Sequence, residues 1–144
     1  MLVYSTILGG KEKTALEATI SGIATDRAGN LYVAGKLFKT GSAPPDYPVT
    51  DGAYRTTFTN NSDLIFVTKL DPSGKHVLYS SILGGSSYNH VQGIAVDSAG
   101  SAYIAGSTLS ADYPVTSGAF QTSKAGGGDA FITKLSPDGS YLIY

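Results

Sequence analysis

The sequence of 144 residues contains no cysteine and a single methionine. The absence of cysteine excludes disulfides, thiolate metal sites and cysteine nucleophiles, and it leaves open whether the protein works in a reducing or an oxidising compartment. Charge is also scarce, because Asp, Glu, Lys and Arg make up 15% of the residues and the formal net charge is -1. The sequence therefore has neither the excess of basic residues that is typical of nucleic-acid-binding proteins nor an acidic tail.

Long apolar runs are absent as well, so we expect no insertion into a membrane. The chain opens with Met1–Tyr4 and passes directly into a strand-like segment. Basic residues followed by a long apolar stretch, which mark a signal peptide, are not seen there. A segment cut from a larger secreted protein would look the same.

Glycine and tyrosine are abundant, with 18 and 10 residues, and 42% of the chain is hydrophobic. The hydrophobic content is sufficient for a packed core at this length. Many glycine, serine and threonine residues, with few runs of helix-forming residues, favour short strands joined by tight turns.

Four segments of the first half recur in the second half in the same order. The matching pairs are residues 2–10 and 77–85, 22–35 and 93–106, 46–54 and 112–120, and 66–70 and 131–135. The spacing between partners decreases along the chain, which places insertions of the first copy near residues 11–17, 39–45 and 62–65. Length changes confined to connections are expected of a repeated structural unit.

Each copy predicts four antiparallel strands, at residues 20–26, 30–37, 63–70 and 76–83 of the first copy. Turn sequences such as Asp26–Gly29 and Asp71–Gly74 separate them. The strand interiors are apolar or small on both faces, which indicates sheets that are covered on both sides. The sequence therefore predicts an all-β fold made of two four-stranded β-propeller blades.

We assign residues 1–76 to the first blade and residues 77–144 to the second. Closed propellers contain about four to eight blades, so two blades do not close a ring. We expect a cyclic homo-oligomer, either a trimer of six blades or a tetramer of eight. In it, the N-terminal strand, residues 2–8, would complete the last blade of a neighbouring chain.

Four motifs carry a resemblance to a known family. They are Tyr-Ser-Ser-Ile-Leu-Gly-Gly at residues 79–85, the segment 93–108, Asp-Tyr-Pro-Val-Thr at 112–116 and Asp-Ala-Phe-Ile-Thr-Lys-Leu at 129–135. In these motifs the chain resembles the bacterial SBBP-type β-propeller repeats. The resemblance implies a propeller in large, mostly exported or surface-attached bacterial proteins, and hence a location outside the cell or at its surface. It transfers no catalytic residue to this sequence.

The long connection of each copy supplies the candidate ligand-binding residues, which are Asp46 and Tyr54 in the first copy and Asp112 and Phe120 in the second. Each aspartate precedes Tyr-Pro, where it either faces a ligand or forms a local turn. The two aromatic residues are candidates for exposure at a binding rim.

Other polar residues have structural interpretations. Asp26 and Asp97 either cap their hairpin turns or bind calcium, which requires several oxygen ligands. Lys69 and Lys134 suggest either side chains that reach toward solvent from an apolar surface or an ion pair between blades. His76 and His90 lack a metal-binding spacing, and we predict no metal, no cofactor and no catalytic residue. The repeated tyrosines are expected to pack in the core with hydroxyl partners.

The leading functional hypothesis is a noncatalytic repeat scaffold that binds a protein or a glycan. Two alternatives are open at this stage. One is a glycan-cleaving lyase or hydrolase whose site forms only where symmetry gathers one aspartate per blade at the propeller axis. The other is an engineered or excised propeller module without an activity of its own.

Overall fold

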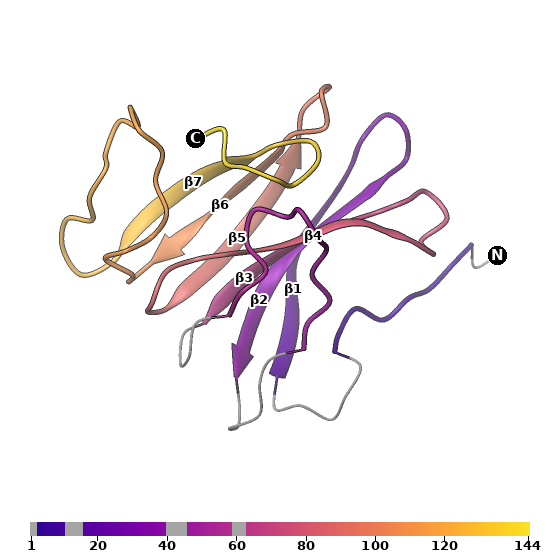
Figure 1. The fold of residues 1–144 in the computed structure, drawn as a ribbon, viewed down its shortest axis with the longest axis horizontal. Coiled ribbons are helices and arrows are strands. Elements are labelled where there is room, and N and C mark those ends of the chain that lie inside the picture. Colours follow the sequence, from indigo (N-terminus) through magenta and orange to yellow (C-terminus); the bar gives the residue numbers. More distant parts are fainter. Residues whose placement is uncertain (1–2, 11–15, 40–45, 59–62) are drawn as a thin grey trace.

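The computed structural model describes residues 3–10, 16–39, 46–58 and 63–144. These residues form seven strands and no helix (Figure 1). The strands are β1 (Leu16–Thr25), β2 (Leu31–Lys39), β3 (Leu64–Leu70), β4 (Val77–Leu83), β5 (Asn89–Val96), β6 (Ala102–Thr108) and β7 (Asp129–Leu135). Most residues of the two insertions predicted near residues 11–17 and 39–45 lie outside the described residues. The described strands confirm the all-β class.

The strands form two antiparallel sheets, in the orders β1-β2-β3-β4 and β5-β6-β7. The prediction of four strands in the second copy is wrong for the described chain. Beyond β7 there is a single bridge, between Leu135 and Leu142. Residues 3–8 form no strand, so the expected N-terminal strand is not formed within one chain.

The two sheets repeat each other in detail. Both first strands carry an irregularity at the same place, between Ile20 and Gly22 in β1 and between Val91 and Gly93 in β5. Both first hairpins turn through a glycine with positive φ, 85° at Gly29 and at Gly100. Glycine adopts this conformation without the steric cost that a side chain adds. The repeated sequence therefore encodes a repeated backbone.

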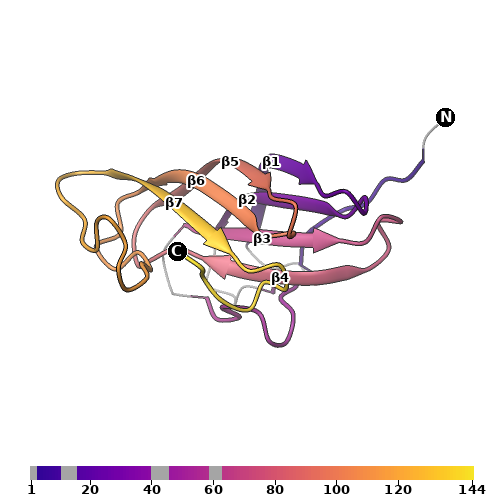
Figure 2. The ribbon, with the colours of Figure 1, turned by 90° about the horizontal axis from the view of Figure 1, so that it is seen from above.

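The sheets stack face to face, with β5 next to β1 and β2 (Figure 2). One core lies between them and combines Tyr32, Ala34, Ile65 and Val67 of the first sheet with residues such as Ile104 of the second. A second core covers the opposite face of the first sheet. Strands β2 and β3 are thus buried on both faces, as their continuous apolar sequences predict, whereas β1 is mostly exposed.

The boundary between the two sheets lies later in the chain than the boundary between residues 76 and 77 that the sequence repeat suggested. Strand β4 pairs with β3 and belongs to the first sheet, and the second sheet begins at Asn89. The described part of the chain contains no helix that is long and apolar enough to cross a membrane.

Candidate functional site

The first hairpin of the first sheet carries a cluster of polar side chains around Asp26. The carboxylate accepts hydrogen bonds from the backbone N–H groups of Ala28 and Asn30, at 3.0 and 2.9 Å. The Asn30 amide and the Tyr32 hydroxyl donate to its other oxygen, at 2.8 and 3.2 Å. Burial acts to raise the pKa of Asp26, but these hydrogen bonds outweigh it and hold the pKa below its usual value. Asp26 therefore caps its turn.

The second sheet repeats this cluster around Asp97. Its carboxylate accepts hydrogen bonds from the N–H groups of Ala99 and Ser101, and Lys134 lies 3.0 Å away. The hydrogen bond from Lys134 is the main cause of the lowered pKa of Asp97. Lys69 lies 3.7 Å from Asp26 in the same way. Both ion pairs lie within one blade, so the suggestion that these lysines pair between blades is wrong.

Tyr32 crosses from one blade to the other. Its hydroxyl donates to the backbone oxygen of Gly100 at 3.0 Å, in the turn of the second sheet, and this acceptor shares the single hydroxyl proton with the Asp26 carboxylate. Its ring is fully buried, and burial raises the pKa of its hydroxyl well above the ordinary value. Tyr103 holds the same place in the second sheet, where its hydroxyl contacts Asp97, but the described part of the chain has no third sheet beyond it.

The predicted aspartates of the long connections hold neighbouring segments together. Asp112 accepts hydrogen bonds from the N–H and the hydroxyl of Ser86, at 2.8 and 2.9 Å. These two bonds are the main causes of its lowered pKa. The Asp46 carboxylate lies against Gly10, as Asp112 lies against Gly85. Both aspartates thus join their connection to the Gly-Gly segment that follows an outer-strand motif.

The predicted aromatic residues differ from each other. Phe120 is fully exposed, as expected for a rim. Tyr54 is half-buried, packs against the core between the sheets, and its N–H donates to Gly139 O at 2.7 Å. The exposure of Tyr54 is lower because the second blade lies beside it, whereas no further blade of the described chain lies beside Phe120. Ligand binding by Asp46, Tyr54, Asp112 and Phe120 stays a prediction.

A tyrosine anchors each connection against its sheet. Tyr47 and Tyr113 pack on Phe66 and Phe131, with ring centroids 4.8 and 4.5 Å apart. The Tyr47 hydroxyl is 3.1 Å from Thr68 Oγ1, and burial raises its pKa to about 12. For these two pairs, the prediction that the repeated tyrosines pack with hydroxyl partners is confirmed. It is wrong for Tyr4 and Tyr144, which are exposed, and Tyr79 is buried but its hydroxyl has no hydrogen-bond partner among the described residues.

The remaining candidates have local partners. His76 Nδ1 lies 3.1 Å from the Asp71 carboxylate in an exposed turn, and His90 stacks on Tyr88. Lys36 forms an ion pair with Asp63 at 2.8 Å. In the described ranges no three His, Asp or Glu side chains are grouped to hold a metal ion.

Asn89 is a buried polar residue that no sequence motif singled out. It is fully buried at the start of β5, where its amide nitrogen donates to Asp63 O and Ser87 O, at 2.7 and 2.8 Å. Its oxygen accepts hydrogen bonds from the hydroxyls of Thr108 and Ser110, at 2.7 and 3.1 Å. Ala18 holds the equivalent place in β1, so Asn89 is specific to the junction between the two sheets.

The two outer faces of the stack expose apolar residues whose repeat partners are buried. On the first sheet Ile20 is 61% exposed, and its partner Val91 is fully buried between the sheets. On the second sheet Ile132 is 67% exposed, and its partner Val67 is fully buried. Ala105, next to Ile132, is exposed where Ala34 is buried. Comparison of the two copies position by position is the sequence signal that would have found these residues.

These exposed positions define two surfaces. Each surface consists of the repeat equivalents of residues that form one side of the contact between the two sheets. The front flank is formed by Ile20 and Ile23 of the first sheet, and the rear flank by Ala105, Ala130 and Ile132 of the second. Inside the chain, the equivalents of the rear flank pack against the equivalents of the front flank.

The comparison with known families agrees with this architecture. A family model described as the SBBP β-propeller repeat matches residues 3–36 and, a second time, residues 78–114. No curated protein is significantly similar to the chain.

Proposed function

Because this chain carries two tandem repeats of the SBBP β-propeller family, we propose that it is a noncatalytic scaffold module that assembles by stacking blades. In this proposal copies of the chain associate head to tail into a closed ring. The long connections, with the fully exposed Phe120, then present a surface for a protein or a glycan. The resemblance to exported repeat proteins supports a location outside the cell.

The observation that carries the proposal is the difference in burial between equivalent residues. Val67 and Ala34 have no exposed surface, whereas Ile132 and Ala105 are exposed on the rear flank. Apolar side chains gathered on one face mark an interaction surface. Since the front flank exposes the opposite half of the same contact, the rear flank of one copy is complementary to the front flank of the next.

Sedimentation velocity of flank variants tests this proposal. Ala105→Asp and Ile23→Asp each place a carboxylate where the stacking buries an apolar side chain, on opposite flanks. Either change is expected to weaken assembly by more than about tenfold, because a buried unpaired charge is costly. Retention of the assembled species in both variants would contradict the proposal.

Ser98→Asp is the matched control. Ser98 lies in a turn at the existing contact between the sheets and is nevertheless exposed. The same added charge at this position is expected to leave the sedimentation profile unchanged.

A further inference from the structure

The second sheet has an open groove along the outer edge of β7. A cavity of about 690 Å³ lies between this strand and the connection of residues 110–124, and Tyr144 also lines it. Its lining includes Tyr113, Thr116, Phe131 and Thr133. Lys134 at the end of β7 exchanges backbone hydrogen bonds with Ile143 and Tyr144. Along the preceding part of β7, residues 129–133, no further strand of the described residues pairs with this edge. An unpaired edge of this kind is a template for another strand.

The first sheet shows what fills the same space. There β4 pairs with β3 on one side and bonds to the connection on the other. Thr50 N donates to Ser80 O at 3.1 Å, Ser80 N donates to Thr50 Oγ1 at 3.0 Å, and Ile82 N donates to Arg55 O at 3.0 Å. Thr116 and Gln121 hold the places of Thr50 and Arg55 beside the groove.

One side chain of the groove has a partner in the first sheet that it lacks in the second. Thr68 Oγ1 lies 3.1 Å from the Tyr47 hydroxyl and 2.8 Å from Ser80 Oγ. Its counterpart Thr133 has the equivalent tyrosine, Tyr113, at 3.0 Å. The place of Ser80 is taken by no described residue of the chain.

We infer that this groove is the seat of Ser5–Leu8 from a second copy of the chain, which adds an outer strand to the second sheet. Ser5-Thr6-Ile7-Leu8 repeats Ser80-Ser81-Ile82-Leu83 of β4. With the register of β4, Ser5 lies opposite Thr133 and Ile7 lies opposite Phe131, as Ser80 lies opposite Thr68 and Ile82 opposite Phe66. Main-chain pairing then supplies affinity, and the side-chain pockets supply specificity.

The N-terminal segment is available for this role. Residues 3–8 are unpaired, and Ile7 is 95% exposed, whereas its equivalent Ile82 is fully buried. Tyr4, Tyr79 and Tyr144 hold the same place in the repeat. With the register of β4, Ser5–Leu8 therefore lie beside the part of β7 that precedes Lys134.

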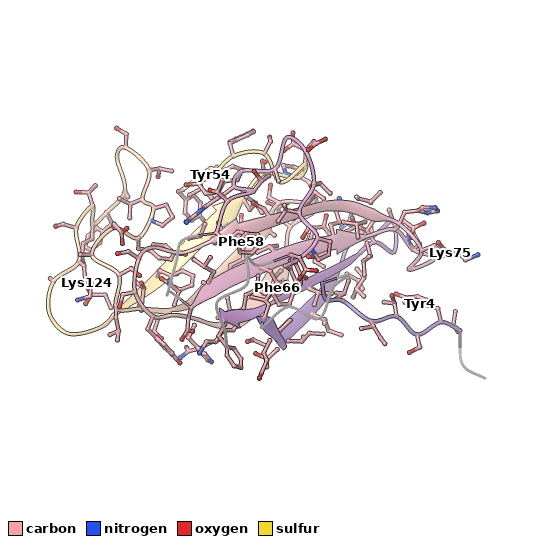
Figure 3. The ribbon with its side chains drawn as sticks, turned by 60° about the horizontal axis from the view of Figure 1, so that its bottom comes forward. Tyr4, Tyr54, Phe58, Phe66, Lys75 and Lys124 are labelled. Carbon is pink, nitrogen blue, oxygen red and sulfur yellow. The ribbon has the colours of Figure 1, made fainter. Side chains whose placement is uncertain are left out.

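A copy does not fill its own groove, because the two features lie at opposite ends of the molecule. Figure 3 shows Tyr4 at one end and Lys124, which lines the groove, at the other. The segment also lies where the outer strand of a preceding blade would. A Cβ atom at Gly74 would be 2.5 Å from the Tyr4 ring, and one at Gly139 would be 2.5 Å from the Tyr79 ring. A head-to-tail neighbour therefore brings its segment to the groove.

This inference rests on the proposed head-to-tail assembly, and a peptide experiment tests it separately. The probe is a fluorescent synthetic peptide of residues 4–10, and the receptor is the full chain carrying Ile7→Asp, whose own segment no longer fits. Anisotropy is expected to show saturable binding, and a peptide carrying the same Ile7→Asp change is expected to bind at least about tenfold more weakly. NMR shifts are expected at Phe131 and Thr133.

Three results would overturn the inference: no binding, equal binding by a peptide of scrambled sequence, or shifts that avoid β7. If one of them occurs while Ala105→Asp and Ile23→Asp still abolish assembly, the strand seat is wrong and the flank contact stands. If the peptide binds but both flank variants assemble normally, the proposed stacking is wrong and the strand seat stands.

The full chain supplies a second readout with a matched control. Ile7→Asp is expected to reduce assembly of the chain, whereas Val3→Asp is expected to have little effect. Leu78, the counterpart of Val3, remains half exposed even in the paired strand β4, and Ile82 does not. Equal assembly by both variants would count against the seat.

Discussion

At the scale of single residues, the repeat keeps glycine where a neighbouring strand leaves no room for a side chain. Gly35 and Gly106 hold the same place in β2 and β6. A Cβ atom at Gly106 would meet the backbone oxygen of His90 and lie 2.8 Å from the Phe131 ring. Gly35 faces Thr19 O and Phe66 in the same way. Glycine is present at these points because the neighbouring strand and an aromatic ring occupy the space of a side chain.

Gly106→Ala is therefore expected to lower the free energy of unfolding by about 3 kcal/mol, since the backbone in the adjacent strand cannot move aside without loss of pairing. Urea denaturation monitored by circular dichroism measures the change. Gly127→Ala is the control, because a Cβ atom there meets nothing within 4 Å. Similar effects of the two changes would contradict this explanation.

Asp138 provides a residue-scale prediction about pH. Hydrogen bonds from Ser136 Oγ at 2.6 Å and Ser140 Oγ at 2.8 Å stabilise its carboxylate and lower its pKa from 3.8 to about 2. Because the folded-state pKa is the lower one, the contribution to stability is present above pH 4 and is lost as the pH falls through 2. Carboxyl-detected NMR titration should give this midpoint, and a midpoint at the ordinary value would refute the assignment.

Some residue roles follow from the sequence and others do not. Hairpin capping by Asp26 and Asp97 was one of the two roles that the Asp-x-x-Gly turn suggested, because this residue type bonds its own following backbone. Tyr54 and Phe120 looked alike in the sequence, but only Tyr54 has a blade beside it. Burial of that kind depends on a neighbour that the local sequence does not specify.

At the scale of elements, turn residues and repeated apolar segments predicted the strands of the first sheet. The fourth strand of the second sheet was predicted by analogy with β4 and is reduced to one bridge in the described chain. The motif of residues 2–8 predicted a strand, yet residues 3–8 have no partner strand within one copy. A strand motif indicates the preference for pairing, whereas pairing itself requires an available edge.

The junction between the sheets depends on Asn89. Asn89→Ala removes a buried amide and leaves polar groups such as Asp63 O and the Thr108 hydroxyl without their partner. Unsatisfied buried groups cost about 1–3 kcal/mol each, so we expect a loss of about 3 kcal/mol in the free energy of unfolding. Thermal and urea denaturation measure it.

Gln92→Ala in the same strand serves as the control, because Gln92 is exposed. Its effect is expected to stay within about 0.5 kcal/mol. If Asn89→Ala is equally mild, Asn89 does not hold the junction.

At the scale of the whole molecule, assembly through the two flanks is expected to depend little on salt. The flanks are built from isoleucine and alanine side chains, and the formal net charge of the chain is -1. Assembly through these surfaces is therefore expected to persist in about 1 M sodium chloride, where exposed charge pairs are screened. Sedimentation at low and high salt measures this. Dissociation at high salt would indicate an electrostatic contact instead of blade stacking.

The central claim is that two blades with complementary flanks complete a ring with further copies. Native mass spectrometry of the purified chain tests this most directly, because the number of chains doubled gives the number of blades. We expect one discrete species of three or four chains of 14.9 kDa each. A chain that remains monomeric at micromolar concentration would contradict it.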